Sequence, residues 1–233
     1  MPDDLWDRFS YLARDMSQSP DLASTLGVAV EGATALVAGA EAAGISMVHH
    51  GRSIDTPAAT DERCRRGDAL QYELGQGPCL QAIHQQETVR SRDLRTEERW
   101  PEWSRRASEE LGFRSMLCVQ LFVTQDTLGA MNLYASQPDA FDVDDEATAL
   151  AVAAQVAVAL TAAEELESVQ SVVASRIALG QAQGMLMQRY RLAPERAFAV
   201  LAREAHASGR RLRDVADDIV RNGVIEGHWT DDD

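Results

Sequence analysis

Arginine side chains gather near the end of this chain. Residues 172–221 hold nine arginines and five acidic residues, a net charge of +4, whereas the whole chain of 233 residues carries -15 and the rest therefore carries -19. All 22 basic residues are arginine, whose planar guanidinium group binds phosphate oxygens in pairs. This contrast indicates an end that binds a polyanion, attached to an acidic body. Because binding depends on local phosphate contacts rather than on total charge, an acidic protein can still bind nucleic acid.

Three helices are expected to position these arginines. A helical pattern that begins with the acidic "FDVDDE" continues to near Arg189, Pro194 suits the first turn of a second helix, and Gly209 suits its left-handed end. Gly184 costs the first helix about 1 kcal/mol relative to alanine, so we expect another helix, in preference to RNA, to approach it closely. The apolar positions of the last two helices are Ala197, Val200, Leu201 and Ala205, then Leu212, Val215, Ala216 and Ile219.

The long helix also carries a heptad repeat. Its members follow one another at alternating spacings of four and three residues and include one polar position: Val152, Val156, Ala159, Ala163, Leu166, Gln170, Val173 and Ile177. This spacing is typical of a parallel coiled coil between two chains, in which Gln170 helps to fix the register. The same face can instead pack on the sheet of the preceding domain. Both can hold, with the early part on the sheet and the later part between chains.

The preceding part of the chain has the pattern of an α+β domain that ends in antiparallel strands. Helices are expected near 5–16, 21–40, 61–72 and 100–111, the last of them closed by Gly112. The expected strands are "AGISMVHH" and "SIDTPAAT", which form a hairpin, a short "TVRS", and the pair "SMLCVQLFV" and "LGAMNLYAS" joined through "TQDT".

A glycine- and proline-rich turn interrupts this domain in "ELGQGPCLQAI". Pro78 suits the first residue of a short helix. The loop residues Gly75, Gly77, Pro78 and Cys79 can border a ligand cavity, or they can form a turn that only closes the sheet. Cys79 is a candidate redox thiol, but a buried apolar cysteine is the favoured interpretation because the sequence shows no cationic partner.

Several classes of protein are disfavoured by what the sequence lacks. Three widely spaced cysteines without a Cys-x-x-Cys pair give neither a disulfide framework nor a zinc site. No Walker, Gly-x-Ser-x-Gly or His-Glu-x-x-His motif occurs, so no catalytic set and no required cofactor are predicted. The apolar run 147–163 is mostly alanine and too short to span a bilayer. The acidic start "MPDDLWDRFS" does not suit a signal peptide, which favours the cytoplasm.

The basic end resembles the ANTAR domain, the three-helix RNA-binding output module of bacterial antitermination regulators. The resemblance covers about 171–223 and depends on "RIALGQAQGMLMQRYRLAPERAFAVLAREA" followed by "RRLRDVADDIV". Gln183 stands where the family commonly has lysine, and Gly209 where it commonly has asparagine. The resemblance implies that RNA is contacted by Ser175, Arg176, Gln181, Gln183, Arg189, Tyr190, Arg203, Arg210, Arg211 and Arg213. Arginine planes, amides and aromatic rings suit the unstacked bases of hairpin loops.

The first part resembles a GAF domain, an α+β module that senses small molecules or other signals. The matching pieces are "LQYELGQGPCLQAI", "RWPEWSRRASEELGFRSMLCVQL" and "LGAMNLYASQPDAFDVDDEATA". A GAF domain followed by an ANTAR domain is typical of actinobacterial regulators. The expected organisation is therefore a GAF-like sensor domain at 1–160, a coiled-coil linker helix at 161–174, an all-α ANTAR domain at 175–226 and an acidic tail at 227–233.

Together these features predict a cytoplasmic, homodimeric regulator without a membrane partner. Its sensor would read a small molecule or a protein, and its ANTAR domain would bind paired stem-loops in nascent transcripts to control antitermination. One alternative is a DNA-binding regulator whose last two helices act as a helix-turn-helix. Another is an enzyme of signalling-nucleotide turnover in the GAF half, which would need a metal or a catalytic base that the sequence does not show.

Overall fold

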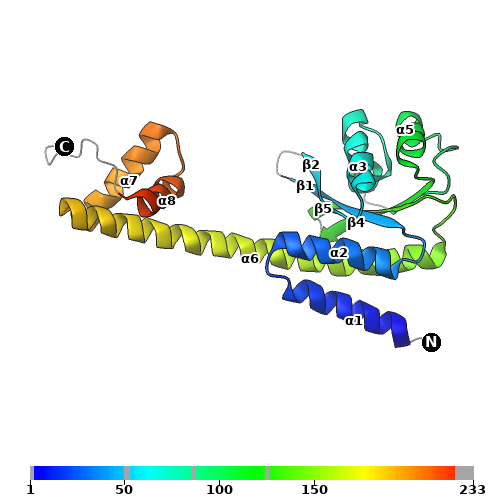
Figure 1. Ribbon diagram of the computed structural model, residues 1–233, viewed down its shortest axis with the longest axis horizontal. Helices are drawn as coiled ribbons and strands as arrows, with labels where there is room; N and C mark the ends of the chain where they lie inside the picture. Colours follow the sequence, from blue (N-terminus) through cyan, green and yellow to red (C-terminus); the bar gives the residue numbers. More distant parts are fainter. Residues whose placement is uncertain (1–2, 50–52, 86–87, 124–125, 224–233) are drawn as a thin grey trace. The chain divides into compact units, whose positions relative to one another are not determined.

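The computed structural model describes residues 3–49, 53–85, 88–123 and 126–223. Contacts divide the chain into two compact units, residues 1–165 and 166–233. One helix, α6 (Val143–Tyr190), belongs to both units (Figure 1). The expected acidic tail at 227–233 lies outside the described residues, as do the last residues of the expected ANTAR domain, 224–226.

The first unit alternates helices with the strands of one sheet, as the sequence pattern predicts. Its helices are α1 (Asp3–Gln18), α2 (Leu22–Leu36), α3 (Glu62–Leu74), α4 (Pro78–Gln85), α5 (Pro101–Leu111) and the first part of α6; its strands are β1 (Ala42–Val48), β2 (Ile54–Ala59), β3 (Val89–Ser91), β4 (Ser115–Val123) and β5 (Asp126–Ala135). Pro78 begins α4, and Gly112 ends α5 in the left-handed conformation, so both of these predictions are confirmed.

The five strands form one antiparallel sheet in the order β2-β1-β5-β4-β3. The expected hairpin of β1 and β2 is confirmed, and so is the pairing of β4 with β5. Alternate residues of β5 face opposite sides: Met131 and Leu133 belong to one apolar core, whereas Ala130 and Tyr134 belong to the other. A sheet that is buried on both faces needs helices on both faces.

Helices α2 and α6 lie on one face of the sheet, with α1 packed on the outer side of α2 (Figure 1). Helices α3, α4 and α5 pack on the other face. The first core joins residues of α1, α2 and α6 to the sheet, and the second contains the buried Trp100 and Trp103. The Trp103 indole nitrogen donates a hydrogen bond to the Gly67 carbonyl at 2.9 Å, which ties α5 to α3. Such a donor is usually paired when the indole is buried.

Helix α2 ends at Leu36, earlier than the expected end near residue 40. The chain turns there because Gly39 lies directly against residue 140. A side chain at Gly39 would collide with the Ala140 carbonyl oxygen, and the Gly39 backbone N–H donates to Asp145 Oδ1 at 3.1 Å. This contact between distant segments has no local signature in the sequence.

The first part of α6 packs inside the first unit. Val152, Val156 and Leu160 are fully buried in the core that α6 shares with the sheet. Val152 and Val156 therefore cannot contact a second chain, and their assignment to a dimer seam is wrong, whereas the alternative of packing on the sheet holds for them. The helix is long and apolar enough to cross a membrane by length and composition alone, and 33% of its apolar window is buried inside the protein.

The second unit is a small three-helix domain made of the rest of α6, α7 (Pro194–Ser208) and α8 (Leu212–Asn222). Pro194 is the first residue of α7, and Gly209 ends this helix with φ 64°, as predicted. The predicted apolar positions of α7 and α8, except Leu212, which is half-buried against the cluster, form its core together with residues of α6: Ala178, Ala182, Leu186, Ala197, Val200, Leu201, Ala205, Val215, Ala216 and Ile219. This arrangement confirms the predicted all-α C-terminal domain.

Candidate functional site

A fully buried carboxyl group lies between the sheet and α3. Asp68 accepts hydrogen bonds from Tyr134 Oη (2.5 Å), Asn132 Nδ2 (2.9 Å), Thr56 Oγ1 (3.0 Å) and Gln71 Nε2 (3.3 Å). All four donors are neutral, so the carboxylate is satisfied by hydrogen bonds rather than by an opposite charge. We call the group the Asp68 cluster; it consists of Ser46, Thr56, Asp68, Gln71, Tyr72, Asn132 and Tyr134.

Burial raises the pKa of Asp68 to about 6, and the hydrogen bonds from Tyr134, Thr56, Asn132 and Gln71 oppose that rise. Removing a carboxylate from water disfavours its charged form, whereas donors favour it. Helix α3 brings Asp68 to this place because Cys64, Asp68 and Gln71 lie on its buried face, at helical spacing. The group is therefore poised to change charge in mildly acidic solution.

The glycine- and proline-rich loop borders the Asp68 cluster. Gln71 Oε1 accepts a hydrogen bond from the Cys79 backbone N–H at 2.8 Å, and Cys79 Sγ donates to Ser46 Oγ at 3.2 Å. Gly77 has φ 140° and lies so close to Gln71 that a side chain there would collide with it. Pro78 is buried, whereas Gly75 is exposed as the left-handed cap of α3. The loop thus both closes α3 and encloses polar groups.

The thiol of Cys79 is buried, as the favoured interpretation predicts. Burial raises the pKa of this thiol to about 12, and the nearby Asp68 carboxylate adds to the rise. Cys64 and Cys118 are also buried, and burial raises the pKa of both thiols. Thiolates are the reactive form of cysteine, so these thiols are unreactive near neutral pH. Among the residues that the structure describes, no group of three or more His, Cys, Asp or Glu side chains could hold a metal ion.

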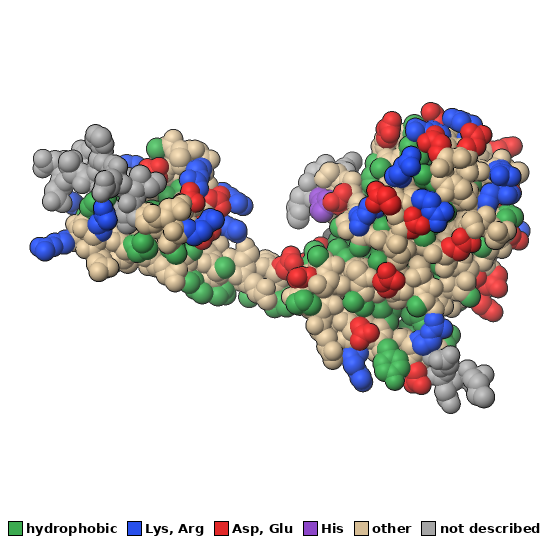
Figure 2. Space-filling model, in the orientation of Figure 1, with side chains coloured by type: hydrophobic (Ala, Val, Ile, Leu, Met, Phe, Trp, Pro, Cys, Tyr) green, Lys and Arg blue, Asp and Glu red, His purple; other side chains and the backbone are tan. Residues whose placement is uncertain are grey.

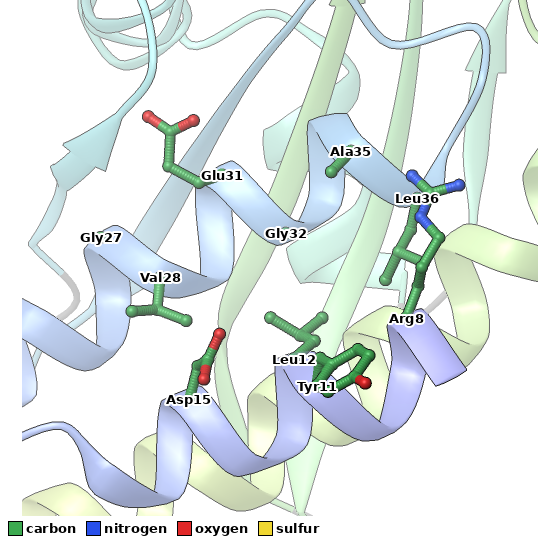
Figure 3. A pocket seen from close by; sticks show the side chains of 10 residues that line it. All are labelled: Arg8, Tyr11, Leu12, Asp15, Gly27, Val28, Glu31, Gly32, Ala35 and Leu36. Carbon is green, nitrogen blue, oxygen red and sulfur yellow. The ribbon is translucent and has the colours of Figure 1, made fainter. Parts of the chain in front are cut away.

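A groove of about 640 Å³ lies between α1 and α2. Figure 3 shows Leu12 pointing from α1 toward Gly32 on α2, where a larger residue would collide with it. The groove is bordered by charges of both signs, since Arg8 lies on its wall together with Asp15 and Glu31. It therefore offers no charge preference for an anion.

The arginines of the second unit fall into two groups. Arg211 binds Asp214 through two hydrogen bonds of 2.8 and 3.0 Å, and Arg210 Nη2 lies 2.6 Å from Asp218 Oδ2. Figure 2 shows basic and acidic side chains side by side on this unit. These two arginines were predicted to contact RNA, but aspartates of α8 already bind and neutralise them. Arg176, Arg189 and Arg203 are exposed, and Arg176 has no ion pair or hydrogen bond of its side chain within the described part of the chain.

Arg213 has a different environment from Arg210 and Arg211. Its Nη1 donates a hydrogen bond to Ser171 Oγ of α6 at 2.9 Å, and its Nε lies 3.7 Å from Asp214 Oδ1. A pocket of about 350 Å³ opens here between α6 and the start of α8. Three of the residues predicted to contact RNA line this pocket, namely Ser175, Arg176 and Arg213.

The remaining predicted RNA contacts lie elsewhere on the second unit. Gln183 Nε2 donates to the Pro194 carbonyl at 2.7 Å, so this amide is used to hold the start of α7. Tyr190 is half-buried against the core, and Gln181 is exposed on α6. A side chain at Gly184 would meet nothing within 4 Å, so the expected close approach of another helix is wrong.

The later members of the heptad repeat are exposed in the second unit. Leu166, Val173 and Ile177 have 50%, 50% and 55% of their surface exposed, and Gln170 lies exposed among them. Figure 2 shows hydrophobic side chains uncovered along this part of α6. Ala159 and Ala163 of the repeat are half-buried in the first unit. Uncovered apolar side chains in a row on a helix are common on surfaces that take part in protein interactions.

The amino-acid pattern alone did not reveal the Asp68 cluster. The available signal was a charged residue, Asp68, at helical spacing from the apolar Cys64 in "RCRRGDALQYEL". Its partners Asn132 and Tyr134 lie on β5, more than 60 residues away along the chain. No local pattern links residues that meet only after the sheet has formed.

Comparison with protein families gives two matches. The GAF domain model matches residues 19–161, which is more than half of the chain, and the ANTAR domain model matches residues 167–220. The chain belongs to the GAF domain family and carries a C-terminal ANTAR domain. An ANTAR domain implies an RNA-binding antitermination regulator and a GAF domain implies a signal sensor, so this GAF–ANTAR chain has the domains of a regulatory sensor.

Solved structures resemble the first unit of the GAF–ANTAR chain. The GAF domain of an Acinetobacter phosphoenolpyruvate-protein phosphotransferase aligns with a TM-score of 0.56 at 16% identity, over 71% of this chain and 97% of that one. Free methionine-R-sulfoxide reductase from Neisseria meningitidis, in complex with its substrate, aligns with a TM-score of 0.52 at 15% identity, over 70% and 91%. At this identity the likeness concerns the fold alone. No curated protein matches the chain.

Proposed function

We propose that this protein is a cytoplasmic, signal-responsive regulator that binds paired stem-loops in nascent transcripts through its ANTAR domain and thereby controls transcription antitermination. The observation that carries the proposal is the pocket beside Arg176 and Arg213, where basic groups and apolar walls occur together. Guanidinium groups bind phosphates, and apolar walls suit unstacked bases. The proposed ANTAR domain spans residues 175–226, and the proposed sensor domain spans 1–160.

The helix-turn-helix alternative is disfavoured by the charge of α8, which would be the recognition helix. This helix carries Asp214, Asp217 and Asp218 but only two arginines, Arg213 and Arg221. A helix in the major groove lies between two rows of phosphates, so excess carboxylates oppose its entry. The pocket between α6 and α8, in contrast, suits a single-stranded loop.

We infer that two copies of the chain pair through the exposed part of the heptad repeat. The contact residues are Leu166, Gln170, Val173 and Ile177, which lie along one side of α6 in the second unit. Their spacing is that of a coiled coil, and Gln170 supplies a polar position that favours one register. The proposed linker, residues 161–174, contains the start of this seam. A dimer would present two RNA-binding domains to two stem-loops.

We propose that the signal is received by the Asp68 cluster and the loop from Gly75 to Cys79. Support comes from the concentration of buried polar groups beside a loop that has two glycines and a proline. A small molecule or a protein that rearranges these hydrogen bonds would act on the sheet against which α6 packs. Because a signal acts only through a difference in affinity between two states, its effect requires two arrangements of the helices. We propose no enzymatic role for this domain.

The nucleic-acid preference is tested with the full-length protein by fluorescence anisotropy. A labelled RNA with two short stem-loops is compared at matched salt with a duplex DNA of equal length. We expect the RNA to bind at least tenfold more tightly, a difference of about 1.4 kcal/mol. Equal or tighter binding of the duplex DNA would favour the helix-turn-helix alternative.

A further inference from the structure

We propose that the pocket between α6 and α8 holds one unstacked nucleobase of a bound stem-loop, while Arg176 and Arg213 bind the phosphates on either side of that nucleotide. This inference rests on the proposed RNA-binding function and extends it to a defined subsite. The pocket lies entirely within the second unit, and its volume of about 350 Å³ is at the lower end for ligand sites. Its size suits a single base rather than a helical segment.

The walls of the pocket are aliphatic. Val172 and Leu179 come from α6, two turns apart, and Leu212 comes from the start of α8. Leu179 and Leu212 are half-buried against the core of the unit, so these walls are fixed by packing. Apolar side chains of this kind can cover both faces of a flat base and remove it from water. Val172 is 51% exposed and forms the outer edge of the pocket.

Charge decides what kind of ligand fits. Both charged residues that line the pocket, Arg176 and Arg213, are basic. The groove between α1 and α2 contains Asp15 and Glu31, and the pocket beside α5 contains three glutamates. The pocket in the second unit thus combines two guanidinium groups with an apolar floor, which complements a base and its flanking phosphates.

Hydroxyl groups at the pocket can read the edge of the base. Ser175 Oγ donates to the Ser171 carbonyl at 2.8 Å, so its lone pairs are available to accept a hydrogen bond from an amino group of the base. Ser171 Oγ accepts from Arg213 at 2.9 Å and keeps its own hydrogen for donation. This hydrogen bond also positions the Arg213 guanidinium at the mouth of the pocket.

The pocket and the proposed dimer seam occupy different sides of α6. At 100° per residue, Val172 and Leu179 lie within about 20° of one another, whereas Val173 and Ile177 lie more than about 90° away from both around the helix axis. Pairing through the seam therefore leaves the pocket open. Each chain of a dimer would hold one base from one loop, which explains why two stem-loops would be needed.

The test uses the full-length protein and a labelled RNA with two stem-loops, in which each loop nucleotide is replaced in turn by an abasic one. Stacking of a base on a protein is worth about 1–3 kcal/mol, so we expect one abasic position to weaken binding by about tenfold. Val172→Trp should fill the pocket, weaken binding of the intact RNA by about tenfold and cause no additional loss with that abasic RNA. Ala199→Trp is the matched control, because Ala199 is exposed on α7, outside both the pocket lining and the seam.

The outcomes separate the pocket from the broader function. If the wild-type protein binds the RNA but Val172→Trp binds it equally well, or if every abasic position is tolerated, the pocket does not hold a base and the inference is overturned while the RNA-binding function stands. If the wild-type protein binds none of these RNAs, the proposed function fails and the inference fails with it. Equal losses in Val172→Trp and Ala199→Trp would also contradict a specific pocket.

Discussion

Arg211 and Asp214 form a bidentate ion pair at the start of α8, with Arg211 Nε 2.8 Å from Asp214 Oδ2 and Arg211 Nη2 3.0 Å from Asp214 Oδ1. The hydrogen bond from Arg211 holds the pKa of Asp214 below its usual range, so this carboxylate is charged at neutral pH. The arginine count of a segment therefore overstates the positive charge that it offers to RNA. The same limit applies to Arg210, which Asp218 binds.

Asp214→Asn should strengthen RNA binding. The substitution removes a negative charge beside Arg211 and Arg213, and we expect affinity to rise about threefold to tenfold, with a steeper dependence on salt because one further phosphate contact releases counterions. Anisotropy titrations at several salt concentrations measure both quantities. Asp7→Asn makes the same charge change at an exposed position of α1, far from α8 in sequence, and serves as the control. If Asp214→Asn leaves the affinity for RNA unchanged, Asp214 does not compete with RNA for the neighbouring arginines.

Arg176→Gln should weaken RNA binding more than Arg211→Gln does. The side chain of Arg176 makes no ion pair with another described residue, whereas Asp214 already binds Arg211. Loss of one phosphate contact should lower affinity about threefold to tenfold and reduce the salt slope by about 1. Both residues are exposed, so the thermal midpoint should stay nearly constant in each variant. Equal effects of the two substitutions would mean that the ion pair with Asp214 does not reduce the contribution of Arg211 to RNA binding.

Replacing Leu166 and Val173 together by aspartate should split the dimer. Four charges would then face one another in the proposed seam. Sedimentation velocity should show a monomer, and circular dichroism should show an unchanged helix content. Ser168→Asp adds a charge to the side of α6 opposite the seam, where Ser168 is exposed, and should leave the dimer intact. Persistence of the dimer in the double variant, or a monomeric wild-type protein, would argue against this seam.

Val156→Asp should destabilise the sensor domain rather than act on a dimer. Val156 is fully buried in the core between α6 and the sheet. An uncompensated carboxylate there should lower the free energy of unfolding by several kcal/mol. Thermal unfolding followed by circular dichroism should show a large fall in the midpoint. A variant that is as stable as the wild type and monomeric would instead assign Val156 to the dimer contact.

Asp68 should make the sensor domain less stable as the pH rises from about 4 to about 6. Its pKa is raised on folding, from 3.8 to about 6, so the folded state holds a proton that the unfolded state releases in this window. The stabilisation from this proton is complete below about pH 4 and is lost as the pH passes 6. The free energy of unfolding should fall by about 3 kcal/mol at most, because one pKa unit is worth about 1.4 kcal/mol.

Unfolding midpoints of the wild type and of Asp68→Asn, taken from pH 4 to pH 8, isolate this contribution. We expect the stability of the wild type relative to the variant to fall as the pH rises toward 6 and to level off above it. A difference that does not depend on pH would show that Asp68 has the same pKa in the folded and unfolded states.

The sequence predicts features that depend on local chemistry. Pro194 and Gly209 mark the ends of α7, and Gly112 marks the end of α5, because each residue has the backbone conformation that such an end requires. The five strands follow from runs of β-forming residues that are bounded by turn residues. Family resemblance supplied the order of the two domains, which the comparisons bear out.

Features that depend on contacts between distant residues could not be read in the same way. The heptad spacing identified one face of α6, but it could not tell that Val152 and Val156 pack on the chain's own sheet while Val173 stays exposed. The glycine at 184 suggested a close neighbour, yet the space beside it is open. The Asp68 cluster and the pairing of Arg210 with Asp218 likewise depend on folded geometry.

The most direct test of the account is binding of the full-length protein to an RNA with two stem-loops, compared with the same RNA in which one loop is scrambled, over a range of salt. We expect tight binding that requires both loops and weakens as salt rises, because two RNA-binding domains act together and each contacts phosphates. If scrambling one loop leaves the affinity unchanged, or if the RNA binds no better than duplex DNA, paired recognition of stem-loops is wrong.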